Sequence, residues 1–97
     1  MKEAFIYDAI RTPRGKAKAD GSLADLSPFA LLKSLYDAIE ARTGLNQSWV
    51  QDVILGCVSQ VGEQGGNVAK ASLLVADWPD HVPAITINRY CSSGLDA

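Results

Sequence analysis

Apolar residues along this chain fall into short continuous runs that alternate with helical patterns. Three runs rich in β-branched and aromatic residues are bounded by turn residues and predict strands, at residues 4–9, 52–58 and 84–87. The run at 52–58 is apolar almost throughout, which is typical of a parallel strand buried on both faces. Strands that alternate with helices predict an α/β fold with a parallel sheet and covering helices.

Two helices are predicted between these strands. The first is bounded by Ser27 as its cap, Pro28 in the first helical position and Gly44 at its far end. Its apolar residues recur at helical spacing, so one face would cover the sheet. Residues 48–51 have the spacing of a capping box and predict one short turn. The second helix, over residues 67–77, is apolar on nearly every side and would need cover on nearly every side.

Composition is that of a globular chain. Of the 97 residues, 47% are hydrophobic and 21% are charged, which excludes a disordered chain. The net charge of −2 provides no general field for nucleic acid or an anionic membrane, so neither partner is expected. The amino terminus lacks the pattern of a secretory signal, and no apolar run approaches the roughly 18 residues of a spanning helix. A cytoplasmic location is expected.

The cysteines and the histidine limit the possible site chemistry. Cys57 and Cys91 are the only cysteines, and they show no metal spacing, so neither a zinc site nor a disulfide framework is expected. Cys57 lies within an apolar run and is interpreted as a small core residue. The single histidine, His81, lies in a loop between prolines and is interpreted as an ordinary loop residue.

Cys91 is the strongest candidate for a nucleophile. It lies just past the predicted strand at 84–87 and just before small residues that allow a helix to begin close to the sheet. The first turn of that helix would aim unpaired N–H groups at the sulfur and favour the thiolate, which is the reactive form. In parallel sheets, chemistry gathers at the carboxyl ends of strands, where Cys91 is expected.

The residues around Cys91 resemble the nucleophile motif of the thiolases, N-x-x-C-x-S-G-L-x-A. The motif is matched by Asn88, Cys91, Ser93, Gly94, Leu95 and Ala97. Ketosynthases and hydroxymethylglutaryl-CoA synthases also place a cysteine between a strand and a helix, but they lack this Ser-Gly-Leu. The segment INRYCSSGL, residues 87–95, is most similar to the 3-ketoacyl-CoA thiolases of β-oxidation. Further resemblance runs through three stretches, at residues 8–16, 52–58 and 62–70.

The resemblance implies a thiolase-like fold, an α-β-α-β-α stack in which residues 1–97 form the amino-terminal portion of the N-terminal domain. It implies an acyltransferase that cleaves 3-ketoacyl-CoA, or runs the reverse condensation, through an acyl thioester on Cys91. Coenzyme A would be a co-substrate, with no permanently bound cofactor and no metal, and the complete enzyme would be a homodimer or homotetramer. The family's catalytic histidine and second cysteine have no counterpart in these residues, so the chain alone is expected to be inactive.

Two loops have open interpretations. The loop at 11–27 carries four basic side chains that could contact coenzyme A phosphates. The favoured interpretation is a solvated loop whose Arg-Thr-Pro turn, at residues 11–13, has a structural role. The glycines at 62–66 match neither the dinucleotide fingerprint nor the phosphate-binding loop. They are interpreted as allowing a close approach to the nucleophile or across a subunit contact.

Two other functional classes remain as alternatives. A thiol redox protein could use Cys91 as a peroxide-sensing thiolate in the same position at the start of a helix. A non-catalytic interaction domain could use the Cys-Ser-Ser-Gly run as a tight structural turn. Rapid oxidation of Cys91 by hydrogen peroxide, without reaction towards acyl-CoA, would favour the redox protein.

Overall fold

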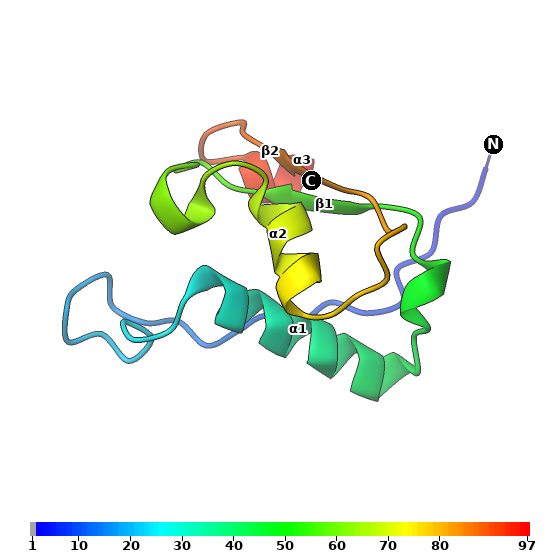
Figure 1. The fold of residues 1–97 in the computed structure, drawn as a ribbon, viewed down its shortest axis with the longest axis horizontal. Coiled ribbons are helices and arrows are strands. Elements are labelled where there is room, and N and C mark those ends of the chain that lie inside the picture. The colour runs from blue at the N-terminus through cyan, green and yellow to red at the C-terminus, as the bar shows by residue number, and fades with distance from the viewer. Residues whose placement is uncertain (1) are drawn as a thin grey trace.

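The computed structural model describes residues 2–97 and contains a two-stranded parallel sheet that lies between helices (Figure 1). The α-helices are α1 (Pro28–Thr43), α2 (Val68–Val75) and α3 (Ser93–Asp96), and the strands are β1 (Val53–Gly56) and β2 (Ala84–Ile87). Two short 3-10 turns, η1 (Gln47–Trp49) and η2 (Gly62–Gln64), precede β1 and α2. The order β1, α2, β2 confirms the predicted parallel α/β unit.

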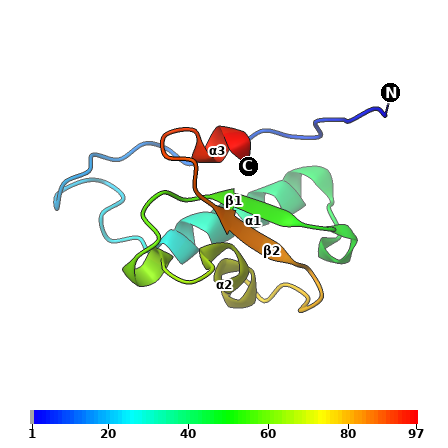
Figure 2. The ribbon, with the colours of Figure 1, turned by 90° about the horizontal axis from the view of Figure 1, so that it is seen from above.

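The two faces of the sheet carry different cover. The strands pair in parallel with Val53 opposite Ala84 and Ile54 opposite Ile85. Val53 and Ala84 pack against the core on the α2 side, and α1 forms a further layer behind α2. Figure 2 shows α3 on the other side of the sheet from α2. The fold is therefore layered: α2 covers one face of the sheet, and α3 packs against β1 on the other face (Figure 2).

The core is small and centres on Leu73, Trp78 and Val82. The ring of Tyr36 in α1 packs against Trp78 with ring centroids 5.2 Å apart. The Tyr36 hydroxyl lies 2.7 Å from the Ser72 hydroxyl, so one polar contact joins α1 to α2 inside the apolar layer. Burial raises the pKa of Tyr36, and the hydrogen bond with Ser72 opposes that rise.

Helix α1 has the ends that the sequence predicts. The Ser27 hydroxyl accepts the Ala30 N–H, Pro28 occupies the first helical position, and Gly44 adopts a left-handed φ of 69°. The short turn before β1 also forms, but it begins earlier than predicted. Asn46 caps it by accepting the Ser48 N–H, so Ser48 receives the cap rather than providing it.

The predicted strand over residues 4–9 does not form. This segment is extended, but it joins neither edge of the two-stranded sheet, and Ile6 and Tyr7 are both 89% exposed. It crosses the carboxyl end of α1 instead, held by two contacts between Asp8 and the Arg42 guanidinium, and borders an apolar cavity of about 630 Å³. Strand propensity identifies residues that suit a sheet, but a strand also needs a paired edge.

Burial of β1 on both faces is also not observed. Within residues 2–97, Ile54 is 47% exposed and its register partner Ile85 is 49% exposed, so these two side chains form an open apolar strip on the α3 face. Strand β1 is four residues long rather than the predicted seven, because β2 offers only four paired positions. Residues 52–58 are apolar enough for burial on both faces, but within residues 2–97 one face of β1 stays largely exposed.

Residues 1–97 on their own should self-associate. Their accessible surface of 7351 Å² exceeds the about 5,400 Å² typical of a compact monomer of this mass. Their radius of gyration of 14.1 Å likewise exceeds the about 12.5 Å of a compact domain of this length. Exposed apolar strips drive association, so sedimentation velocity should show concentration-dependent species. A monodisperse monomer that unfolds cooperatively would contradict this expectation.

Candidate active site

Cys91 lies in the turn between the carboxyl end of β2 and the first residue of α3. Its side chain is exposed and its thiol is free. Cys57 follows the last residue of β1, and its N–H donates to the Ile87 carbonyl at 2.9 Å. Because the strands are parallel, both cysteines lie just past the carboxyl ends of the strands, on the same side of the sheet. The sequence predicts the nucleophile at this position.

The Asn88 side chain closes the first part of this turn. Its Oδ1 accepts the Tyr90 N–H at 2.9 Å, which is the arrangement of an Asx turn. Its Nδ2 donates to the Val58 carbonyl at 3.4 Å, so the same side chain ties the turn to the segment that follows β1. Asn88 thus joins the chain after β2 to the chain after β1.

The Ser93 side chain closes the second part. It is 4% exposed, and its Oγ accepts the Arg89 N–H at 2.8 Å while donating to the Tyr90 carbonyl at 2.6 Å. The hydroxyl therefore uses both its donor and an acceptor lone pair within the turn. Tyr90 has a φ of 47°, a left-handed conformation that costs a residue with a Cβ about 1–2 kcal/mol. These side-chain hydrogen bonds hold the turn in that costly conformation.

Gly56 allows the first turn of α3 to rest on β1. A Cβ at this position would lie within 2.5 Å of backbone atoms of Ser93 and Gly94. In the sequence, Gly56 is one position of a predicted apolar strand, and a glycine inside a strand often marks a close backbone approach. That signal was available in the sequence, but the residue that approaches Gly56 could be identified only in the folded chain.

The sequence predicts that the N–H groups at the start of α3 point at the Cys91 sulfur. In the structure they do not contact it. The Ser92 N–H donates to the Arg89 carbonyl at 3.0 Å, and the Ser93 N–H donates to the Tyr90 carbonyl at 3.1 Å. These donors are therefore used inside the turn. Among residues 2–97, the Cys91 sulfur has no hydrogen-bond partner, so its position is set by the backbone that carries it.

The interpretation of Cys57 as a core residue is wrong, because its side chain is only partly buried. Its Sγ accepts from Gln64 Nε2 at 3.5 Å and lies 3.8 Å from the Ser59 carbonyl, to which it can donate. The strand has ended by this position, and residues 57–64 fold back over the sulfur as a loop. Cys57 is thus a loop thiol engaged in local hydrogen bonds, whereas the Cys91 thiol is open.

Within the described residues, the glycines at 62–66 do not approach the nucleophile turn, and their alternative role at a subunit contact stays a prediction. Gly62 and Gly66 have left-handed φ values of 55° and 65°, and a Cβ on either would meet no atom within 4 Å. Their role here is to supply turn conformations that favour glycine. The close backbone approach next to the nucleophile turn occurs at Gly56 instead.

His81 lies near the amino-terminal end of β2, whereas Cys91 lies past its carboxyl end. It precedes β2 by three residues, and its Nε2 lies 3.2 Å from the Ser48 carbonyl, which joins this loop to the turn before β1. The length of β2, about 10 Å, separates the two ends of that strand. His81 is therefore an exposed loop residue, as predicted, and not a partner of Cys91 in this structure.

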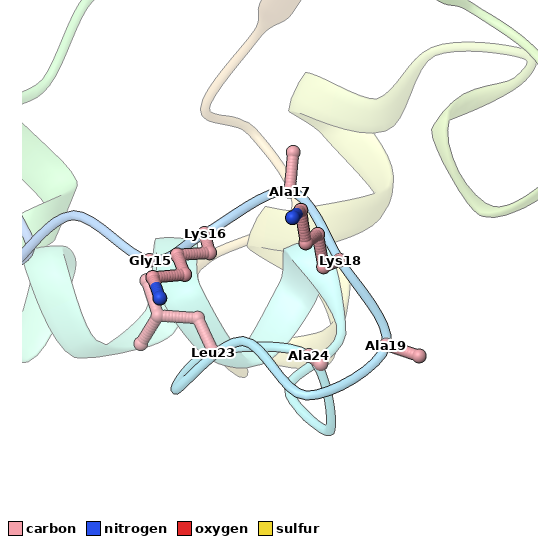
Figure 3. Close-up of a pocket in the computed structure, with 7 residues that line it drawn as sticks. All are labelled: Gly15, Lys16, Ala17, Lys18, Ala19, Leu23 and Ala24. Carbon is pink, nitrogen blue, oxygen red and sulfur yellow. The ribbon is translucent and has the colours of Figure 1, made fainter.

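The basic loop projects from the amino-terminal end of α1 (Figure 1). Residues 15–19 border a cavity of about 500 Å³ together with Leu23 and Ala24. Figure 3 shows the Lys16 and Lys18 side chains on the loop that rims this cavity. The Gly21 N–H donates to the Lys18 carbonyl at 2.9 Å, so the loop contains a hydrogen-bonded turn, but this turn lies after residues 11–13, where the sequence predicts one and the structure forms none.

Clusters of metal ligands and membrane-spanning helices are both absent from the part of the chain that the structure describes. No three His, Cys, Asp or Glu side chains within residues 2–97 come together as a metal site requires. Over the same residues, none of the helices combines the length and the apolar character needed to cross a membrane.

Comparison with known proteins gives consistent similarities over the whole chain. The profile of the thiolase N-terminal domain matches residues 4–97. A 3-ketoacyl-CoA thiolase of Bacillus subtilis is 45% identical over 97 residues, which cover 100% of this chain and 25% of that protein. A β-ketoadipyl-CoA thiolase of Acinetobacter baylyi is 46% identical over 104 residues, which cover 100% of this chain and 24% of that protein.

The fold has a counterpart among solved structures. The crystal structure of the Bacillus anthracis acetyl-CoA acetyltransferase matches with a TM-score of 0.70 and 35% identity. The match covers 79% of this chain and 19% of that one. A steroid 3-ketoacyl-CoA thiolase of Mycobacterium tuberculosis is 40% identical over 100% of this chain and 23% of its own length. The chain thus spans about a quarter of the length of the curated relatives that it matches.

Proposed function

Because the chain belongs to the thiolase family, we propose that it supplies the nucleophile, Cys91, for thiolytic cleavage of a 3-ketoacyl-CoA. One observation carries the proposal: Cys91 presents an open thiol on a hydrogen-bonded turn past the carboxyl end of β2. The relatives include proteins named 3-ketoacyl-CoA and β-ketoadipyl-CoA thiolases, which supports a 3-ketoacyl thioester as the substrate class.

In the proposed reaction the Cys91 thiolate attacks the 3-keto carbon of the substrate. The resulting alkoxide collapses and breaks the bond between carbons 2 and 3, and the electron pair leaves on the acetyl-CoA enolate. A general acid protonates that enolate, while the shortened acyl group stays on the Cys91 sulfur as a thioester. The thiolate of free coenzyme A then attacks the thioester, releases acyl-CoA and regenerates the Cys91 thiolate. A thiolate suits both steps because it is a strong nucleophile and a competent leaving group.

The oxyanions formed in these steps need hydrogen-bond donors. Loss of one such donor typically costs about 3–4 kcal/mol of transition-state stabilisation. The Cys91 backbone N–H is the donor that the family resemblance assigns to this chain, and its orientation would follow from the same turn that positions the sulfur. The proton-transfer groups are proposed to come from outside residues 1–97, since His81 lies near the amino-terminal end of β2, away from Cys91.

The wider context is part of the same proposal. We place residues 1–97 in the amino-terminal portion of a thiolase N-terminal domain, with the rest of the fold supplied in cis or in trans; this combination is called the assembled enzyme below. Coenzyme A would be a co-substrate and no permanent cofactor would be bound. The relatives' names support a role in fatty acid or related acyl-CoA metabolism. A cytoplasmic homodimer or homotetramer completes the proposal.

Alkylation tests the proposed nucleophile. Iodoacetamide at pH 7 should modify Cys91 of the assembled enzyme at least about tenfold faster than Cys57, because the Cys91 thiol is open while Cys57 is partly buried and hydrogen-bonded. Prior incubation with acetyl-CoA should protect Cys91 by forming its thioester. Peptide mass mapping distinguishes the two sites and both adducts.

Two outcomes of this experiment would count against acyl transfer. Equal alkylation rates, or faster reaction of Cys57, would oppose an open nucleophile at Cys91. Rapid oxidation of Cys91 by hydrogen peroxide, combined with no acylation by acetyl-CoA, would favour a thiol redox protein instead.

A further inference from the structure

We infer that Asn88 and Ser93 are positioning residues that hold Cys91 in the geometry needed for acyl transfer. The inference rests on the proposed function and adds a role for two side chains that do not themselves carry the acyl group. Both lie within the turn that bears the nucleophile, one on each side of Cys91. Asn88 binds the backbone of Tyr90, and Ser93 binds the backbone of Arg89 and Tyr90, which are the two residues just before Cys91.

The first argument is the conformation of the turn. Tyr90, immediately before Cys91, has a left-handed φ of 47°, which a side chain with a Cβ seldom adopts. Such a conformation persists only where its surroundings over-determine it. Asn88 fixes the Tyr90 N–H and Ser93 fixes the Tyr90 carbonyl, so both polar groups of this residue are held by side chains.

The second argument is the anchoring of these side chains to the sheet. Asn88 Nδ2 donates to the Val58 carbonyl beyond the end of β1. Ser93 is 4% exposed and its backbone rests against Gly56 of β1. The turn follows β2 in the chain, but it is anchored at two places to β1 and the residues just after β1. A shift of either anchor would move the Cys91 sulfur relative to the sheet.

The third argument is the contrast between two neighbouring serines. Ser92 is exposed and its hydroxyl makes no hydrogen bond within residues 2–97, whereas the Ser93 hydroxyl makes short bonds to Arg89 and Tyr90. The two side chains are chemically identical and adjacent, so they form a matched pair for substitution. Only the loss of the Ser93 hydroxyl should release the turn.

Acyl transfer should be far more sensitive to this release than simple alkylation. Attack on a bound thioester substrate requires aligned reacting atoms, and a displacement of about 1 Å can cost on the order of 10²-fold in rate. Iodoacetamide approaches an exposed sulfur from many directions and has no fixed pose. A positioning role therefore predicts slower turnover by a thiol that remains reactive.

The test compares four variants of the assembled enzyme by steady-state thiolysis of acetoacetyl-CoA. Ser93→Ala and Asn88→Ala should each lower kcat by about 10- to 100-fold with KM changed less than about threefold. Ser92→Ala should leave both constants unchanged. Asn88→Asp keeps the oxygen that accepts the Tyr90 N–H but loses the Nδ2 donor to the Val58 carbonyl, so it should recover part of the activity lost in Asn88→Ala. Alkylation rates of Cys91 and thermal unfolding midpoints are recorded for every variant.

The outcomes separate this inference from the proposed function. An active wild-type enzyme in which Ser93→Ala and Asn88→Ala retain the kcat of Ser92→Ala would overturn the positioning role alone. A rise in KM at unchanged kcat would do the same, because it would indicate a substrate-binding role. A wild-type assembled enzyme without thiolysis would overturn the proposed function and this inference with it. If Ser93→Ala does not fold, the exposed Asn88 pair, Ala against Asp, decides the question.

Discussion

Cys91→Ala should lower thiolysis by the assembled enzyme on the order of 10⁴-fold or more, because no other group in the turn can form the acyl thioester. Loss of a covalent nucleophile removes the intermediate that divides the carbon-carbon cleavage into two easier steps. The measurement is consumption of acetoacetyl-CoA in the presence of coenzyme A. Mass spectrometry of the protein should show the acyl adduct in wild type and not in the variant.

Two further substitutions make this result specific to the thiol of Cys91. Cys91→Ser should be nearly as inactive as Cys91→Ala, since an alkoxide is much harder to form than a thiolate. Cys57→Ala should retain most activity, because Cys57 is a partly buried loop thiol that binds Gln64. Substantial turnover by Cys91→Ala would remove the covalent mechanism, whatever the behaviour of the other two variants.

The placement of Cys91 could be predicted because it depends on local signals. The strand before it has the predicted bounds, 84–87, because a short β-branched run between a proline and polar residues favours a strand over a helix. The ends of α1 were predicted for the same reason, through a capping serine, a proline and a terminal glycine. Signals of this kind act within a few residues and need no knowledge of the rest of the fold.

The absence of residues 4–9 from the sheet and the exposure of one sheet face were not predictable in this way. Residues 4–9 have strand character, yet in the structure the Asp8 ion pair with Arg42 holds them across α1, away from the sheet. The strip formed by Ile54 and Ile85 is apolar in sequence but half exposed in space. Strand pairing and cover depend on contacts between distant segments, which local periodicity does not specify.

The sequence motif gives the identity of the side chains that hold the nucleophile turn, but not their hydrogen-bond partners. Asn88 and Ser93 matched the thiolase pattern, but the pattern does not state what each side chain binds. The motif requires a serine at position 93 and leaves position 92 open, and the structure supplies the physical difference, because only the Ser93 hydroxyl makes two short hydrogen bonds within residues 2–97. The distinction arises because a helical start turns one serine inward and the other outward.

Gly56→Ala should be the most damaging substitution outside the turn itself. The added Cβ would meet backbone atoms of Ser93 and Gly94, which cannot rotate away as a flexible side chain could. Overpacking typically costs about 1–3 kcal/mol, and a clash with backbone belongs at the upper end of that range. Relief of the clash requires α3 to move off β1, and this movement carries Cys91 with it. We expect a lower unfolding midpoint and a loss of thiolysis of about 100-fold or more.

Gly66→Asn provides the matched control for this prediction. Gly66 has a left-handed φ of 65° with open space around its Cα, and asparagine tolerates that conformation better than other residues with a Cβ. This variant should therefore keep both its unfolding midpoint and most of its thiolysis. If Gly66→Asn were the more damaging of the two, the close approach to the nucleophile would lie in the glycine loop after β1, and Gly56 would be an ordinary strand residue. Thermal unfolding and acetoacetyl-CoA turnover, measured on both variants in the assembled enzyme, decide between these two positions.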